Sequence, residues 1–224
     1  MRIAALACLL VLVARTAGAQ DAPDTQAWGQ VLALGEIGED WRTHVEVQPR
    51  FMNDASELGL TIVRTAVGRR VAPRATVWLG HAWVPRTLGA GVQHEQRIWQ
   101  QLTLTAPAAG RWAPSARIRL EQRWLDPWQG LSHRLRVLGR AQRPLGRDTP
   151  WALFAYNEGM FTLDRTPRGP SRGFDRNRLA AGLVFRFSPV ASTDVGYIWE
   201  NAGVPGGRRN DHVIVAVLNL SVPR

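Results

Sequence analysis

Polar and apolar residues alternate along most of this chain, from position 28 almost to its end. The segment ARIRLEQRWL at 116–125 shows the pattern most clearly, with its charged residues on one parity and almost only apolar residues on the other. Successive side chains of a β-strand point to opposite faces, so this segment predicts a strand with one charged face and one apolar face. No helical period competes with the two-residue period after position 27.

Eleven segments of this kind are separated by turn residues such as Gly, Pro, Asn and Asp. Strands of soluble proteins average about five to six residues, whereas strands that cross a membrane need roughly nine to eleven. The lengths favour an all-β fold, an antiparallel transmembrane β-barrel of ten to twelve strands. Because bacterial single-chain barrels have even strand numbers, we expect ten strands or twelve. The segments are 28–37, 41–51, 58–67, 74–84, 95–105, 115–125, 131–143, 150–161, 174–187, 192–201 and 211–221.

The charged parity of these segments determines which face can meet lipid. An arginine that faces lipid at mid-membrane costs about 2–4 kcal/mol, so the arginines of 116–125 would together cost on the order of 6–12 kcal/mol there. In a membrane barrel they must therefore point into the lumen or lie near an interface. We expect a lumen ionic network, which Asp194 and Glu200 extend. Its principal members are Glu46, Arg50, Glu95, Arg97, Arg117, Arg119, Glu121, Arg123, Arg134, Arg136 and Arg178.

Tryptophan is unusually frequent, with ten residues against two tyrosines. Its side chain is favoured at membrane interfaces, where one end is wet and the other apolar. Trp99 falls in the middle of a segment and on the charged parity, so we expect it to fill the lumen. An aromatic girdle is predicted at the segment ends, formed by Trp41, Trp83, Trp124, Trp151 and Trp199.

The charge balance leaves two interpretations of the lumen open. All 28 basic residues are arginine and the formal net charge is +10. These arginines alternate along strands rather than forming a basic cluster, so we expect no nucleic-acid partner. Either Arg–carboxylate pairs across strands fill the interior, or a narrow basic passage selects small anionic solutes. Arginine outnumbers acid in the predicted network, which motivates the second interpretation.

The N-terminus has the three parts of a secretory signal peptide. Arg2 supplies the positive charge, residues 3–14 form an apolar stretch, and Ala17-Gly18-Ala19 is a cleavage site. The apolar stretch is too short to span a membrane as a helix. We therefore divide the chain into a signal peptide at 1–19, an N-terminal tail at 20–27 and a β-barrel domain at 28–224.

Some outer-membrane barrels are enzymes, so any catalytic or metal-binding motif in the chain would bear on its function. Ser132 and His133 are adjacent, but neighbouring residues of a strand point to opposite faces, so they form no dyad by themselves. The five histidines are scattered without a spacing typical of metal ligands. The sequence therefore predicts no catalytic residues, no metal site and no cofactor.

Several short segments together resemble the bacterial family catalogued as domain of unknown function 2490 (DUF2490). The resemblance covers about residues 28–220 and implies a secreted outer-membrane β-barrel, without an established activity. The matching pieces are Trp28, WRTHVEVQPRF at 41–51, EQRIWQQL at 95–102, ARIRLEQR at 116–123, SHRLR at 132–136, NE at 157–158, FDRNRLAAGL at 174–183, GY at 196–197 and His212.

These observations predict a Gram-negative outer-membrane barrel of structural or transport type with an Arg- and Glu-lined lumen. Its expected partners are outer-membrane lipid, the barrel-assembly machinery and, for an open lumen, a small anionic solute. Two other functions fit the alternation. A lipid-modifying barrel enzyme requires His with Ser or Asp to converge across strands on the outer face. A periplasmic, lipocalin-like binding protein requires shorter strands.

Overall fold

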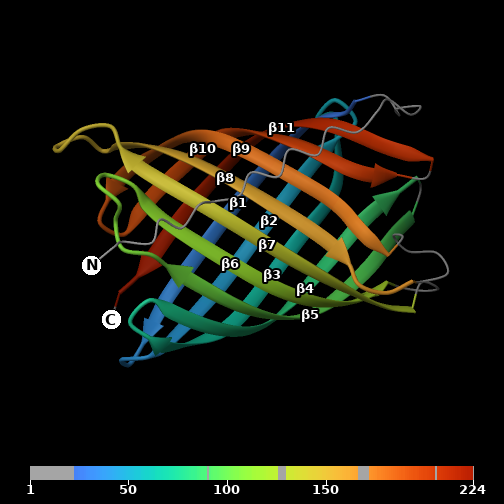
Figure 1. Ribbon diagram of the computed structural model, residues 1–224. Coiled ribbons are helices and arrows are strands. Elements are labelled where there is room, and N and C mark those ends of the chain that lie inside the picture. The colour runs from blue at the N-terminus through green and yellow to red at the C-terminus, as the bar shows by residue number, and fades with distance from the viewer. Residues whose placement is uncertain (1–22, 90, 126–129, 166–171, 205, 224) are drawn as a thin grey trace.

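The computed structural model describes residues 23–89, 91–125, 130–165, 172–204 and 206–223. In this part of the chain the strands form one closed barrel. Figure 1 shows them crossing the wall obliquely, in sequence order around the barrel. No helix among the described residues is long and apolar enough to cross a membrane.

Each of the eleven predicted segments forms a strand, so this prediction is confirmed. The strands have 12–16 residues and are longer than most of the predicted segments, because several extend past the alternating part into the turns. β1 begins at Thr25 rather than at position 28, and the predicted signal peptide at 1–19 lies outside the described residues. The strands are β1 (Thr25–Ile37), β2 (Trp41–Met52), β3 (Glu57–Ala72), β4 (Ala75–Leu88), β5 (Gly91–Thr105), β6 (Ala113–Leu125), β7 (Gly130–Pro144), β8 (Trp151–Thr162), β9 (Gly173–Ser188), β10 (Ala191–Val204) and β11 (Gly207–Val222).

The barrel closes through a parallel pair. Each strand from β1 to β11 pairs antiparallel with the next, and β11 then pairs parallel with β1, from Thr25 opposite His212 to Gly35 opposite Val222. The expectation of an even strand number is wrong for the described chain, and the wall is antiparallel except at this seam. An odd number of up-and-down strands leaves the first and last pointing the same way, so they can pair only in parallel.

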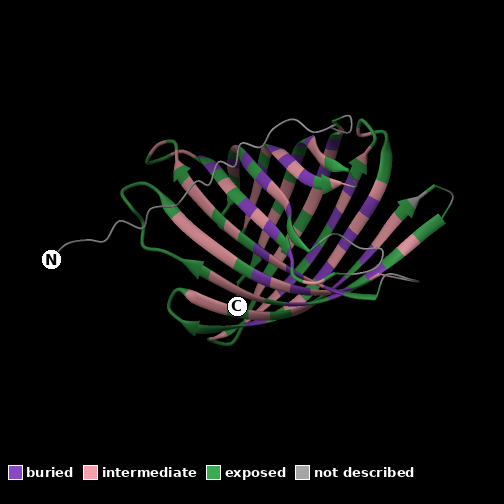
Figure 2. Cartoon of the chain, turned by 45° about the vertical axis from the view of Figure 1, so that its right-hand side comes forward, coloured by how far each residue is buried: buried purple, intermediate pink, exposed green. Residues whose placement is uncertain are grey.

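Burial alternates along the strands, as the sequence predicted. In β2 the side chains of His44, Glu46 and Gln48 are buried, whereas the intervening Val45 and Val47 are 49% and 41% exposed. Figure 2 shows buried segments interrupted by exposed ones along the strands. The exposed apolar side chains form the outer wall of the barrel. They are far more numerous than the side chains of an apolar patch on a typical soluble monomer. This is the arrangement of a barrel whose outer wall faces lipid.

Two apolar clusters lie inside the barrel beside the charges. One combines Trp28 with Phe154, Ile198 and Val213, from β1, β8, β10 and β11. The other combines Leu60 and Ile62 of β3 with Ala82 and Val84 of β4 and with Trp99 of β5. Trp99 is fully buried, which confirms its expected place in the lumen. These clusters fill part of the interior and confine the ionic groups to the remaining lumen.

Candidate functional site: the arginine-rich lumen

All eleven side chains of the predicted ionic network lie on the lumen face. Ten of them take part in ion pairs, and only Arg117 among these ten keeps substantial exposure, at 26% of its side chain. Arg50 is buried as well but pairs with no carboxylate among the described residues. Residues that share the lumen face therefore differ in their pairing.

Glu121, in the middle of the 116–125 segment, is the centre of the network. It is fully buried and accepts hydrogen bonds from Arg134 at 2.6 Å and 3.0 Å and from Arg136 at 3.0 Å. The guanidinium groups of Arg97 and Arg119 approach it to 3.8 Å. Four cations therefore surround one carboxylate. Burial of this carboxylate is tolerated because the surrounding positive charges and hydrogen bonds offset its desolvation.

The ion pairs continue from Glu121 around the wall as an alternating chain. Arg136 connects Glu121 to Glu158, with nitrogen–oxygen distances of 3.0 Å and 2.8 Å. Arg178 connects Glu158, at 3.5 Å, to Glu200, at 2.5 Å. In the other direction Arg97 joins Glu121 to Glu95, which lies 2.7 Å away. The chain thus spans β5 to β10 and ties six strands together through their inner faces.

Arg50 of β2 is held by an aromatic ring and an amide rather than by a carboxylate. Its guanidinium lies 3.7 Å from the ring centroid of Trp28 and donates to the side-chain oxygen of Gln48 at 2.7 Å and 3.1 Å. Arg178 lies 4.7 Å from the same ring. Cation–π contacts of this kind stabilise a desolvated guanidinium but leave its charge uncompensated. Arg50 therefore presents a net positive charge inside the barrel.

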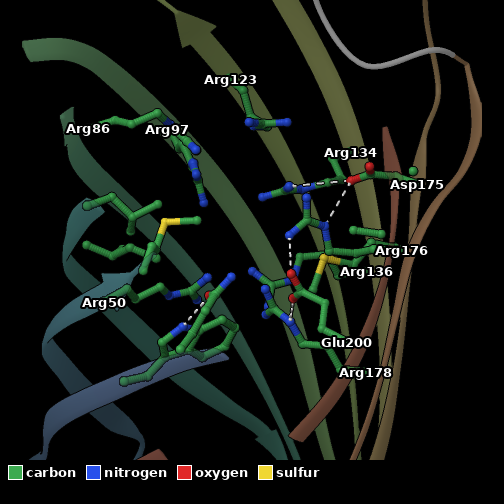
Figure 3. A pocket seen from close by; sticks show the side chains of 18 of the residues that line it. Arg50, Arg86, Arg97, Arg123, Arg134, Arg136, Asp175, Arg176, Arg178 and Glu200 are labelled. Carbon is green, nitrogen blue, oxygen red and sulfur yellow. Dashed lines mark hydrogen bonds and ion pairs between the residues drawn. The ribbon is translucent and has the colours of Figure 1, made fainter. Parts of the chain in front are cut away.

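Two cavities occupy the lumen. The first has a volume of about 430 Å³ and lies at the end where β2, β4 and β6 finish; the second has about 470 Å³ and lies at the opposite end. Figure 3 shows the first cavity, with arginines on several of its walls. The two cavities share part of their lining near the middle of the lumen. The shared residues are Trp28, Arg50, Arg64, Arg136 and Arg178.

Both cavities are strongly cationic among the described residues. Ten arginines line the first cavity, against the carboxylates of Asp175 and Glu200. Seven arginines line the second cavity, against Glu46, Glu158 and Asp194. Several of these arginines are paired with carboxylates behind the lining, such as Glu95 and Glu121. Guanidinium groups nevertheless outnumber carboxylates on the lining of both cavities.

Sequence reasoning missed some members of the network, chiefly Arg64 and Glu158. Arg64 pairs with Glu46, and Glu158 accepts from Arg136 and, at 2.5 Å, from Arg117. Both lie in segments with apolar residues on both parities, so alternation could not assign their faces. A usable signal was present, because a single charge in the middle of a spanning strand is costly in lipid and must point inward.

The five tryptophans of the predicted girdle all lie on the outer face. Trp41 and Trp151 start β2 and β8 and belong to one end of the barrel, whereas Trp124 ends β6 at the other. Trp83 lies toward the latter end, level with Gln96 and Trp124 through the strand register, and Trp199 is half-buried on β10. The first four are 40–49% exposed. Their role at membrane interfaces remains a prediction.

Ser132 and His133 lie on opposite faces of β7, and Asp164 reaches both. The Ser132 hydroxyl is buried and 3.4 Å from the Asp164 carboxylate, whereas the outward His133 Nδ1 is 2.5 Å from it. Burial raises the pKa of Asp164, but the hydrogen bonds from the ring and backbone N–H of His133 outweigh it and lower that pKa below its usual value. Within the described residues no hydrogen bond joins the serine to the histidine, and no group of three or more His, Cys, Asp or Glu is placed to hold a metal ion.

A closed barrel with an apolar outer wall and an ionic lumen defines the class of transmembrane β-barrels. The solved structure of NanC porin, in a rhombohedral crystal form, shares the fold, with a TM-score of 0.52 and 10% identity over 85% of this chain and 95% of that chain. The chain belongs to the DUF2490 family of proteins of unknown function, whose model matches residues 25–211. An uncharacterized protein of Methylorubrum extorquens is 31% identical over 220 residues, 96% of this chain and 94% of that protein. The resemblance noted in the sequence is confirmed.

Proposed function

We propose that this protein is an outer-membrane barrel that provides a narrow passage for small anionic solutes. The outer-membrane location is supported by the signal-peptide pattern at the N-terminus and by the apolar outer wall, which is suited to lipid. The passage is supported by the two cavities, which lie toward the two ends of the lumen and share part of their lining.

Arg50 carries the proposal of anion selectivity. It lines both cavities and has no carboxylate partner among the described residues. A fixed positive charge on the wall of a narrow pore attracts anions and repels cations, and the low dielectric of the wall strengthens the effect. The surplus of arginine over carboxylate in both cavities acts in the same direction.

Planar-bilayer recording of the purified, refolded protein tests this function. Across a potassium chloride gradient we expect small single-channel currents whose reversal potential shows a preference for chloride. Arg50→Gln removes the charge and keeps a polar side chain of similar reach, so the reversal potential should move toward zero. Arg69→Gln makes the same charge change on the outer face and should leave it unchanged.

Two results would contradict the proposal. Absence of current in a protein that has folded, as judged by its heat-dependent gel migration, would mean that the ion pairs fill the lumen. A preference for potassium over chloride in the unsubstituted protein would mean that the surplus guanidinium charge does not control the passage.

A further inference from the structure

The first cavity contains a row of alternating cationic and apolar side chains. Through the strand register, Trp28 of β1 lies opposite Arg50 of β2, Arg50 opposite Leu60 of β3, and Leu60 opposite Arg86 of β4. All four line this cavity. Arg50 and Arg86 are two strand spacings apart, so their Cα atoms are on the order of 10 Å apart with Leu60 between them.

Among the described residues, no carboxylate forms an ion pair with either arginine of the row. Arg50 contacts Gln48 and the Trp28 ring, and Arg86 makes no hydrogen bond or ion pair with any described residue. Figure 3 shows Arg86 beside Arg97, well separated from Arg50 on the same side of the cavity. Arg123, which is 5% exposed, also has a buried Nη1 without a hydrogen-bond partner. The cavity therefore has two cationic poles, one at Arg50 and one at Arg86.

Leu60 separates the two poles, and further apolar side chains line the same cavity. Ile62 belongs with Leu60 to an apolar cluster inside the barrel, and Met160 of β8, which is 1% exposed, is another apolar residue of the lining. An inorganic ion would satisfy one pole and leave this surface in contact with water. A ligand with an acidic group at each end and a hydrocarbon spacer would satisfy both poles and cover the apolar surface.

We propose that the first cavity is a binding site for organic dianions whose two acidic groups are separated by an apolar spacer. Arg86 and its neighbours hold one acidic group, Arg50 holds the other, and Leu60 and Ile62 contact the spacer. This inference rests on the proposed function, because it names the class of solute that the passage would take. The second cavity has fewer arginines and more carboxylates, so we place the site at one end of the barrel only.

Calorimetric titration of the refolded protein in detergent, at low salt, tests the site without requiring any current. The probes are suberate, succinate and octanoate. Suberate has two carboxylates at the ends of a long chain, succinate has two on a short one, and octanoate has the chain length of suberate with one carboxylate. Since only suberate can reach both poles, we expect it to bind about tenfold more tightly, or better, than the other two.

Substitutions at the two poles provide the second arm. Arg50→Gln and Arg86→Gln should each weaken suberate binding by about tenfold or more, since each removes one charge-assisted contact. Arg186→Gln removes an exposed charge from the second cavity and serves as the matched control with unchanged affinity. Arg86 has no described ion pair to lose, so its variant remains informative if Arg50→Gln fails to fold.

Equal affinity for suberate and octanoate, or an Arg86→Gln variant that binds suberate normally, would overturn the site. These outcomes differ from failure of the proposed passage. An anion-selective current without suberate binding would remove the site and leave the passage intact. Suberate binding without current would support the site and identify the barrel as a binding protein.

Discussion

At the scale of single residues, the face on which a charged side chain lies and the partner that neutralises it are determined by different features of the chain. Glu46 and Arg50 lie on the same strand and the same face, yet only Glu46 has an ionic partner among the described residues. Glu46 lies opposite Arg64 in the register of β2 and β3, whereas Arg50 lies opposite Leu60. The register therefore decides which inward charges of a strand lie opposite a charge of the other sign.

This difference limits what the sequence alone can predict about the site. Alternation assigns Arg50 and Glu121 to the lumen because the face of a residue depends only on its own position along the strand. It cannot find the cross-strand neighbours, because the pairing depends on turn lengths and on a register shift between Arg50 and Phe51. Alternation can therefore assign a charged residue to a face, whereas the lack of a carboxylate partner for Arg50 and Arg86 among the described residues depends on the register.

Replacement of Glu121 should strongly destabilise the barrel. Glu121→Gln removes the negative charge that Arg134 and Arg136 share, and a buried pair broken on one side typically costs about 3–5 kcal/mol. We expect a loss of this size in the free energy of unfolding, measured by urea titration in detergent with tryptophan fluorescence.

The matched control for this prediction is Glu36→Gln. Glu36 pairs with Arg42 at 3.3 Å while its side chain is 45% exposed, so its loss should cost about 1 kcal/mol or less. Equal stabilities for the two variants would contradict the view that the buried pairs support the barrel wall.

At the scale of strands, close packing inside the barrel requires a glycine at one position of β4. Gly80 of β4 lies opposite Trp99 of β5, and the indole ring lies over the glycine. A Cβ at Gly80 would come within 2.4 Å of the ring and 2.6 Å of the backbone oxygen of Thr65. Because one obstacle is backbone, rotation of the tryptophan alone cannot make room. The β3–β4–β5 part of the wall thus depends on this glycine.

We therefore expect Gly80→Ala to lower the free energy of unfolding by about 1–3 kcal/mol, the usual cost of overpacking. Gly139→Ala is the control, because Gly139 lies in the middle of β7 on the outer face and a Cβ there meets nothing within 4 Å. Urea titration of both variants measures the difference. Similar stabilities would show that the Trp99 ring and the β3 backbone move apart readily.

The strands themselves were largely predictable, and the way they close was not. Each alternating segment became a strand because periodicity and turn residues are local properties of the sequence. The seam between β1 and β11 joins residues nearly two hundred positions apart, and no local pattern marks it. The general preference for even strand numbers therefore led to a wrong expectation.

At the scale of the whole molecule, the apolar outer wall determines where the protein can be stable. Large hydrophobic side chains on the outer parity of every strand are favourable in lipid and unfavourable in water. The folded protein should therefore be recovered in the outer-membrane fraction and remain there after an alkaline carbonate wash.

Gel migration of that fraction provides a second test of the same prediction. A closed barrel held by buried ion pairs resists detergent at room temperature, so the unheated protein should migrate differently from the boiled one. Recovery in the soluble periplasmic fraction would support the lipocalin-like alternative instead.

The parallel seam also places the two ends of the barrel domain on opposite sides. Because β1 and β11 run in the same direction, the beginning of β1 and the end of β11 lie at opposite ends of the barrel. In a membrane these two points would be reached from different compartments. A label introduced just before Thr25 and one introduced after Val222 would then never be accessible to the same impermeant reagent, which distinguishes this wall from one with an even number of strands.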